Sequence, residues 1–224
     1  MAGPGSYVRL IGVGWTLVRA DALAPREVDP LLPPALRTLA RALRLFAGPQ
    51  ARSGRPGERL AQALERTGPV GIKLGQFLST RADILGAAFA DDLSRLKDRL
   101  APFSLESAKA EVATALGRPL DTLFVSFEPA IAAASLAQAH KVRLKDGRWA
   151  AVKVLRPGVE RRVAADAETL RTAARLAEAW APASRRLEPR AFAETVIRAL
   201  ELELDLRFEA AGADELRAVM AMDG

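Results

Sequence analysis

Cysteine is absent from the 224 residues of this sequence, and histidine occurs once, at His140. Without cysteine the chain can hold no disulfide, no thiolate metal site and no cysteine nucleophile. A single histidine excludes a zinc site built from several histidines, and any Ser-His-Asp triad would have to use His140. The lack of cysteine is compatible with a reducing compartment.

Long apolar runs are also missing. The best candidate, Leu10–Val18, contains two glycines and a threonine and ends at Arg19, well short of the roughly 20 apolar residues that a membrane span needs. Arg9 before it and residues 22–24 after it would suit a short secretory signal. A helix that packs on the protein or grazes a membrane suits the segment better, because the apolar stretch is short and its basic flank is thin.

Aromatic residues make up only 5% of the chain, whereas 50% of its residues are hydrophobic, which excludes a disordered protein. The 33 Lys and Arg residues against 27 Asp and Glu give a formal net charge of +6. Cations and anions alternate along the expected helices, and few aromatics are available for base stacking, so we expect no nucleic-acid partner. The isoelectric point near 10.3 would still draw the chain to an anionic membrane surface.

Proline and glycine divide the chain into three predicted parts. Residues 1–47 form a helical N-terminal arm, in which Leu36–Phe46 has leucines on one face and arginines on the other, as in a helix that lies on a surface. Residues 48–57 have the composition of a linker. Residues 58–224 are then the core of the protein.

Helical patterns occupy both ends of this core. Ser104, with Glu106 in the first turn, predicts a capped helix start, and Gly117 with Pro119 predicts its end. The other predicted helices of the core flank a break at Gly68-Pro69 and cover residues 87–100, 159–180 and 189–221.

Between the helices, apolar residues recur at every second position, which is the period of a β-strand. Alternation predicts strands at 123–127, 138–145 and 149–155, and Asp146-Gly147 is a strong signal for a tight turn between the last two. An alanine-rich turn separates the first two strands. The sequence therefore predicts an α+β fold with a short antiparallel sheet between helices.

Lys153 lies in the middle of the third strand, with valines on both sides. An isolated strand lysine is most simply an exposed edge residue. Here a turn between two strands precedes it and a carboxylate-rich helix follows it. Kinase-type nucleotide sites have this order: a strand lysine holds the phosphates and pairs with a helix glutamate.

The carboxylates are Glu201, Glu203, Asp205 and Glu209. If the helix over 189–221 is continuous, Asp205 shares a face with Glu201 and with Glu209, and Glu203 lies on the other side. A solvated acidic face would explain them as well. Upstream, Lys73 and Gln76 share a helix face, and a surface role is again the simplest interpretation.

Taken together, four segments closely resemble the UbiB family, whose members are atypical protein-kinase-like proteins linked to ubiquinone biosynthesis. The resemblance extends over roughly residues 57–216, and its first motif is quite specific to the family. The segments are GPVGIKLGQFLSTR at 68–81, AAASLAQAH at 132–140, VKVLRPG at 152–158 and ELDLRFEAA at 203–211.

The resemblance implies a catalytic set and a nucleotide-binding set of residues. Lys73 and Gln76 would belong to the Lys-x-Gly-Gln motif that folds over the active site and obstructs protein substrates. Glu203 and Asp205 would be the Glu-x-Asp pair, expected near Lys73. These four residues are the catalytic candidates.

For the nucleotide, ATP or ADP with Mg²⁺, the resemblance implies an alanine-rich loop in place of a glycine-rich one. Its backbone N–H groups can still face phosphate oxygens, although alanine restricts the backbone. Lys153 would hold the phosphates, and Glu209 is the preferred partner of Lys153, with Glu203 as a competitor. The residues of the loop are Ala132, Ala133, Ala134 and Ser135.

The sequence also departs from the family. Gly212 stands where asparagine is usual, and His140 fits the family pattern as a structural residue of the second strand. No asparagine occurs anywhere, so the metal-holding asparagine of a kinase site is missing, as is an Asp-Phe-Gly motif. We therefore expect a truncated or split member that has the small lobe and a helical N-terminal extension without a C-terminal lobe, and without Mg²⁺ ligands of its own.

Three interpretations of the function follow from the sequence. In the first, the chain is the front part of a UbiB-like ATPase or kinase, cytoplasmic or peripheral at the inner membrane, that binds nucleotide weakly and does not catalyse alone. In the second, it is a non-catalytic module that docks on an anionic membrane or on ubiquinone-biosynthesis proteins. In the third, a helical scaffold carries all four motifs by accident.

Overall fold

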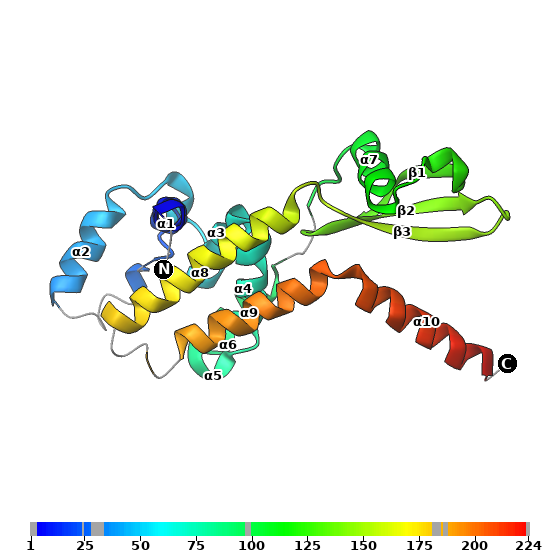
Figure 1. The fold of residues 1–224 in the computed structure, drawn as a ribbon. Helices are drawn as coiled ribbons and strands as arrows, with labels where there is room; N and C mark the ends of the chain where they lie inside the picture. The colour runs from blue at the N-terminus through cyan, green and yellow to red at the C-terminus, as the bar shows by residue number, and fades with distance from the viewer. Residues whose placement is uncertain are drawn as a thin grey trace. The chain divides into compact units, whose positions relative to one another are not determined.

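The computed structural model describes residues 4–23, 25–27, 34–96, 100–180, 185 and 188–222 (Figure 1). Within these ranges helices precede and follow one antiparallel sheet, which confirms the predicted α+β fold. The helices are α1 (Pro4–Arg19), α2 (Pro34–Arg44), α3 (Pro56–Thr67), α4 (Pro69–Ser79), α5 (Ala82–Leu85), α6 (Ala87–Ser94), α7 (Leu105–Leu116), α8 (Val159–Trp180), α9 (Pro189–Leu204) and α10 (Leu206–Met222). The strands are β1 (Phe124–Ala133), β2 (Ala137–Leu144) and β3 (Trp149–Leu155).

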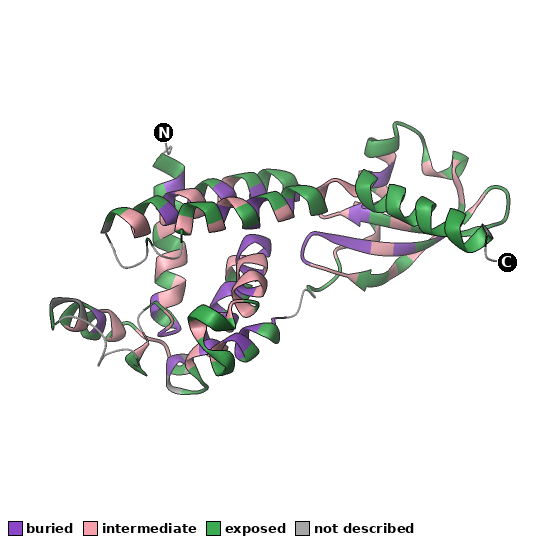
Figure 2. Ribbon diagram, turned by 90° about the horizontal axis from the view of Figure 1, so that it is seen from below, coloured by how far each residue is buried: buried purple, intermediate pink, exposed green. Residues whose placement is uncertain are grey.

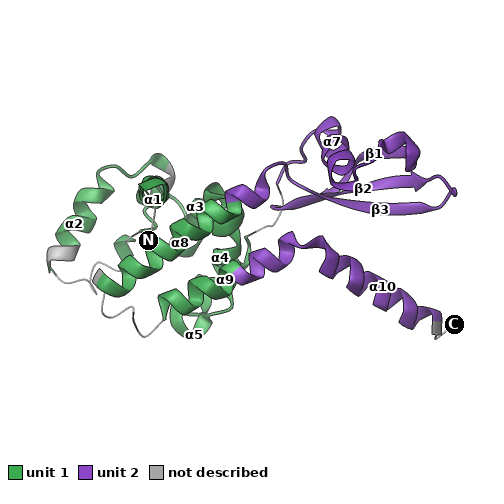
Figure 3. Cartoon of the chain, in the orientation of Figure 1, with its two compact units in different colours: residues 1–97, 163–197 green, residues 98–162, 198–224 purple. Residues whose placement is uncertain are grey.

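The chain divides into two compact units (Figure 3). Unit 1 contains residues 1–97 and 163–197, and unit 2 contains residues 98–162 and 198–224. These units differ from the predicted parts, because the helices of the expected arm belong to the same unit as α3, α4 and α6. Helices α8 and α9 each begin in one unit and end in the other.

The core of unit 1 is formed by α3, α4 and α6. Pro56 and Pro69 are the first residues of α3 and α4, where a missing backbone N–H costs no helical hydrogen bond. Apolar side chains from the three helices form one cluster whose buried members are Ala61, Leu64, Leu93 and Leu96. Gly71 and Gly75 place the backbone of α4 against this cluster.

Helix α1 ends in a Schellman motif. The N–H of Ala22 donates to the Leu17 carbonyl at 2.8 Å, and the N–H of Asp21 donates to the Val18 carbonyl at 3.0 Å. Asp21 has a φ of 51°, in the left-handed region that aspartate tolerates better than most residues. The sharp end of α1 turns the Asp21 carboxylate into the protein, where its side chain is 1% exposed.

Three arginines surround this buried carboxylate. Arg44 from α2 lies 3.1 Å from Asp21 and Arg26 lies 3.3 Å from it, while Arg59 of α3 approaches to 3.5 Å. Arg59 also pairs with Glu27 at 2.8 Å. The predicted arm is thus joined to α3 by an ion-pair network, which explains why both belong to one unit.

The predicted linker, 48–57, is an ordered connection. The N–H of Gly48 donates to the Arg19 carbonyl at 2.9 Å, residues 49–52 form a 3₁₀ turn, and the Gly54 carbonyl accepts from Arg59 at 3.0 Å. Its glycine and proline content reflects a tight path, with Gly54 at a φ of 81°.

Unit 2 is built on the sheet, in the order β1-β2-β3, with both neighbouring pairs antiparallel. Helix α7 packs on one face, where Ala108 and Val112 meet Val154 of β3. The predicted capped start of α7 is confirmed, since Ser104 Oγ accepts from the Ser107 N–H at 3.1 Å. Gly117, at a φ of 60°, caps its C-terminal end as expected.

Three predicted element boundaries are wrong. The first strand extends to Ala133 instead of ending at Phe127, and the helix expected over 87–100 ends at Ser94. The helix expected over 189–221 is broken at Asp205, where α9 stops and α10 starts. Helix α10 is exposed from Arg207 to its last described turn (Figure 2). Over the part of the chain that the structure describes, no helix combines the length and the apolar character required to cross a bilayer.

Candidate functional site

Lys153 lies on the face of the sheet opposite α7. Side chains alternate along a strand, so Val152 and Val154 point toward α7 while Lys153 points away. In the register of β2 and β3, Ala139 is opposite Lys153 and Lys141 is opposite Ala151. Small side chains therefore flank Lys153 and leave its ammonium group accessible on an open face.

The structure pairs Lys153 with Glu209. The ammonium of Lys153, on β3, forms an ion pair with the carboxylate of Glu209, in the first turn of α10. The two side chains remain 41% and 61% exposed, respectively. A surface pair of this kind adds little to stability.

The alanine-rich segment contains the connection between β1 and β2. Ala132 and Ala133 are the last residues of β1, paired with Ala139 and Gln138. Ala134 and Ser135 form the turn, which the Ala134 N–H closes by donating to the Ala137 carbonyl at 2.8 Å. The four residues predicted as a loop are thus divided between the end of β1 and the turn that follows it. This turn connects β1 to β2, and β2 leads to β3.

Arg156 follows β3 directly and reaches back to this turn. Its Nε and Nη2 donate to the Ala134 carbonyl at 3.0 and 2.9 Å. Neither Arg156 nor Gln138 is among the site residues predicted from the sequence. Gln138 is 2% exposed in β2, next to the turn, so its amide needs hydrogen-bond partners inside the protein.

Glu203 and Asp205 lie at the junction of α9 and α10. Asp205 caps α10: its Oδ1 accepts from the Arg207 N–H at 3.1 Å. The Arg207 guanidinium, which donates to both carboxylate oxygens, lowers the pKa of Asp205. Because the helix breaks here, the predicted shared face of Glu201, Asp205 and Glu209 does not form.

Lys73 and Gln76 lie on α4 in unit 1, both partly buried. Glu203 and Asp205 belong to unit 2. The meeting of the Lys-x-Gly-Gln motif with the Glu-x-Asp pair therefore stays a prediction. Gly75, between Lys73 and Gln76, has a packing role, since a Cβ there would lie 2.1 Å from Leu96 Cδ1.

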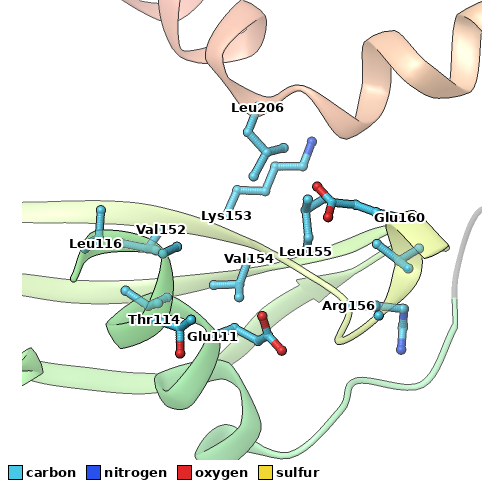
Figure 4. Close-up of a pocket in the computed structure, with 14 residues that line it drawn as sticks. Glu111, Thr114, Leu116, Val152, Lys153, Val154, Leu155, Arg156, Glu160 and Leu206 are labelled. Atoms are coloured by element: carbon cyan, nitrogen blue, oxygen red, sulfur yellow. The ribbon is translucent and has the colours of Figure 1, made fainter. Parts of the chain in front are cut away.

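A cavity of about 350 Å³ borders Lys153 along β3 (Figure 4). Apolar side chains of α7 and β3, among them Val112, Leu116 and Val152, line it together with charged ones, and Leu206 of α10 closes one side. The charged lining residues are Glu111, Lys153, Arg156 and Glu160. None of Ala132 to Ser135 lines it. The structure therefore does not bring the predicted loop and Lys153 into this one cavity.

No group of three or more His, Asp or Glu residues is placed to hold a metal ion among the residues described in the structure. Unit 2 contains the cationic Lys153, the anionic Glu209 and the uncharged turn between β1 and β2. The Lys153 ammonium can hold phosphate oxygens, whereas the Ala134 N–H is bonded to the Ala137 carbonyl and Ser135 is 4% exposed, so phosphate binding by the loop stays a prediction.

The sequence matches a known domain family and several curated proteins. Residues 95–223 match the ABC1 atypical kinase-like domain. The chain is 42% identical over 196 residues to "Probable protein kinase UbiB" of Aliivibrio fischeri (strain MJ11), covering 85% of the chain and 36% of that protein. It is 38% identical over 212 residues to the protein of the same name from Marinobacter nauticus, covering 93% of the chain and 38% of that protein. The chain thus spans between 36% and 38% of the length of these two curated relatives.

Proposed function

The chain belongs to the ABC1 atypical kinase-like family, and from that premise we propose that it binds ATP or ADP, with Mg²⁺, on the sheet face that carries Lys153. The pairing of Lys153 with Glu209 carries this proposal. The two residues lie 56 positions apart in sequence, and their contact brings a strand lysine and a helix carboxylate together on an exposed surface.

The charge of Lys153 suits a nucleoside phosphate. Glu209 balances the ammonium while no ligand is bound, and both groups stay accessible to water. A polyphosphate can approach from the open face and gain a charge-assisted hydrogen bond without displacing packed side chains. The phosphates would lie on the exposed sheet face, at the Lys153 ammonium.

Magnesium would reach this site bound to the nucleotide. The ion supplies charge neutralisation between phosphate oxygens when it is bound. Residues of the chain hold the phosphates, whereas the described part of the chain offers no carboxylate cluster for the ion. We therefore propose that affinity of this chain for magnesium-ADP is weak and depends on Lys153.

Calorimetric titration with magnesium-ADP tests the proposal. Lys153→Ala should weaken binding by about tenfold or more, the loss expected for one charge-assisted hydrogen bond. Lys141→Ala is the matched control, because Lys141 lies on the same sheet and also carries an exposed ammonium, with Nζ 4.1 Å from the centre of the Trp149 ring. Equal losses from both variants, or none from Lys153→Ala, would refute the assigned site.

The biological role proposed for the chain is an atypical kinase or ATPase component that supports ubiquinone biosynthesis. The curated relatives are named UbiB, and the four matched motifs support the same family role. Ubiquinone content of cells with and without the gene, measured by mass spectrometry, tests this role. An unchanged ubiquinone content would contradict it.

An exposed apolar stripe on α1 supports a second function, docking on an anionic membrane. Tyr7, Ile11 and Trp15, spaced by four, are 48%, 72% and 47% exposed, and Phe46 extends the stripe with its ring centre 5.6 Å from that of Trp15. Helix α1 has no acidic residue. Aromatic and aliphatic side chains on an acid-free helix are typical of interfacial helices.

Flotation with liposomes tests this second function. The chain should bind vesicles that contain an anionic phospholipid more strongly than purely zwitterionic vesicles, and Ile11→Glu should abolish the difference. Val125→Glu is the control, since Val125 is 58% exposed on β1. If Ile11→Glu floats as well as the unaltered chain, α1 is not the docking surface.

A further inference from the structure

The sheet of unit 2 has two edge strands, β1 and β3, which differ in regularity. β1 contains Pro129, and its pairing with β2 is interrupted by register shifts, one of them between Phe127 and Ala130. Proline and bulges of this kind hinder the addition of a further strand. β3 contains no proline, and it pairs with β2 without a register shift from Trp149 to Leu155. The β3 edge is therefore the regular edge of the sheet.

The hydrogen bonds at the two ends of β3 identify the backbone groups on this edge. The Arg156 N–H donates to the Leu136 carbonyl at 2.8 Å, and the Leu144 N–H donates to the Arg148 carbonyl at 2.9 Å. Because every second residue of an antiparallel strand bonds to the same neighbour, the even-numbered residues of β3 bond to β2. The odd-numbered residues direct their backbone N–H and C=O groups away from β2, where the described chain has no further strand. These outward-facing residues are Trp149, Ala151, Lys153 and Leu155.

The cavity of about 350 Å³ lies along this edge (Figure 4). Val154 on the α7 face of β3 and Lys153 on the open face both line it, whereas no residue of β2 does. Leu116 of α7 and Leu206 of α10 also line it. A strand placed beside β3 would thus find apolar side chains from both helices.

The charge that remains available in this cavity is negative. Glu111 of α7, which is half-buried, and Glu160 of α8 line the cavity, and neither carboxylate has a hydrogen-bond or ion-pair partner among the described residues. The two cations are already engaged, since Lys153 pairs with Glu209 and the Arg156 guanidinium donates to backbone carbonyls. A ligand with a basic group is therefore the electrostatic complement of the cavity.

We propose that the β3 edge binds an extended segment of another polypeptide, which adds a fourth strand to the sheet of unit 2. The backbone groups of Ala151 and Lys153 supply the hydrogen bonds, and alternate apolar side chains of the segment enter the cavity beside Leu116. A basic side chain of the segment pairs with Glu111 or Glu160. This surface goes beyond the proposed nucleotide site, because it uses the edge of β3 and leaves the sheet face with the Lys153 ammonium open.

A second copy of the chain fits this edge less well. Two β3 strands that pair in antiparallel fashion at their centres would bring the two Lys153 side chains to the same face, opposite or diagonal to each other. Like charges in such positions are destabilising. On its α7 face β3 has only alanine and valine, so a second β3 also offers no basic side chain to Glu111.

Titration with a defined peptide tests the edge on the unaltered chain. The probe has seven residues, the length of β3, with valine and threonine alternating between terminal lysines, and fluorescence anisotropy of a labelled copy gives its dissociation constant. Two control peptides carry N-methyl groups on the valine nitrogens or on the threonine nitrogens. Because only one of these sets faces β3, one control should bind about tenfold more weakly and the other should bind like the probe. Equal affinities of all three peptides would overturn strand addition.

Residue-resolved hydrogen exchange locates the bound peptide. The amides of Ala151 and Lys153 should exchange rapidly in the free chain, whereas those of Val152 and Val154, which bond to β2, should exchange slowly. The probe should slow exchange at Ala151 and Lys153 about tenfold or more and change the two valines little. Protection that falls on β1 instead, or no protection at about 1 mM peptide, would contradict the proposed edge.

A substitution in the cavity wall tests the apolar contact. Leu116→Ser should weaken binding of the probe about fivefold, because it removes apolar surface that the added strand covers. Ile131→Ser is the matched control, since Ile131 is an exposed aliphatic residue of β1, on the other edge of the sheet. Equal affinities of the two variants would contradict a segment seated beside Leu116.

Sedimentation of the peptide-free chain tests the alternative occupant. We expect the amides of Ala151 and Lys153 to exchange rapidly at every chain concentration. A dimer that forms with rising concentration and protects both amides would show that a second copy takes the edge, and would overturn the proposal of another polypeptide.

Discussion

Asp205 shows how one side chain redirects the backbone. Its carboxylate accepts the Arg207 N–H and two bonds from the Arg207 guanidinium, so it caps α10 and ends α9. Helical periodicity alone predicts one long helix, because the leucines, glutamates and arginine next to Asp205 favour a helix. The capping preference of aspartate was the available signal for the break.

The Arg207 side-chain hydrogen bond lowers the pKa of Asp205 from its ordinary value of 3.8. A carboxyl group whose pKa is lower in the folded state stabilises that state above its ordinary pKa and loses the contribution as the pH falls through the folded pKa. Carboxyl carbon titration by nuclear magnetic resonance should therefore give Asp205 a midpoint below 3.8.

Arg207→Gln should move this midpoint upward, though only part of the way, since the backbone N–H of residue 207 still donates to Asp205. Arg217→Gln is the control, because Arg217 pairs with Asp214 at 3.0 Å on the same helix. An Asp205 midpoint that is the same in all three proteins would show that Arg207 does not stabilise the carboxylate.

At the scale of helices, glycines of α4 allow close packing. A Cβ at Gly75 would lie 2.1 Å from Leu96 Cδ1 and 3.0 Å from Leu64 Cδ1, both members of the unit 1 core. At Gly71 it would lie 2.5 Å from the Leu64 carbonyl oxygen, a backbone atom that cannot move aside. The glycine of the Lys-x-Gly-Gln motif thus has a structural reason within its own unit.

Gly75→Ala should lower the free energy of unfolding by roughly 1 to 3 kcal/mol, the cost of overpacking a core. Gly212→Ala in α10 should instead be neutral or stabilise by up to about 1 kcal/mol, since alanine favours helix. Nothing lies within 4 Å of a Cβ at Gly212, so the two substitutions differ only in their surroundings. Urea unfolding measures both, and a Gly75→Ala variant as stable as Gly212→Ala would contradict the packing.

Elements were easier to predict than their ends. The Asp146-Gly147 turn, the Ser104 cap and the alternation around Lys153 are local signals, and the hairpin, α7 and β3 follow them. The end of β1 was missed because Ala130–Ala133 has no alternation of its own, and pairing with β2 decides it. Arg156 was missed because its partners, Ala101 and Ala134, are backbone carbonyls that leave no mark in the sequence.

At the scale of a whole unit, the ion pairs around Asp21 join α1, α2 and α3. The composition of residues 48–57 suggested a linker, yet ion pairs from Asp21 to Arg44 and Arg59 join α1, α2 and α3 across it. Sequence could not show this, because the pairing depends on a left-handed residue that turns the Asp21 carboxylate inward.

Asp21→Asn should destabilise unit 1 by about 3 kcal/mol, the low end of the range for removing one partner of a buried ion pair, because Arg59 retains Glu27. Asparagine also tolerates the left-handed backbone, so the loss reports the charge. Denaturant unfolding measures it, with Asp83→Asn, an exposed carboxylate paired to Arg81 on the surface, as the control. Equal stability of the two variants would mean that the network does not hold the unit together.

The central claim is that nucleotide phosphates lie at Lys153. An acyl-phosphate derivative of ATP transfers its acyl group to a lysine amine close to the phosphates, and mass spectrometry then identifies the residue. We expect acylation of Lys153 that excess magnesium-ADP suppresses, with Lys141 and Lys145 labelled slowly and without suppression. Labelling of Lys73 would support its predicted position over the site. Labelling of Lys141 and Lys145 at the same rate as Lys153, or labelling of Lys153 that magnesium-ADP leaves unchanged, would show that the phosphates do not lie at Lys153.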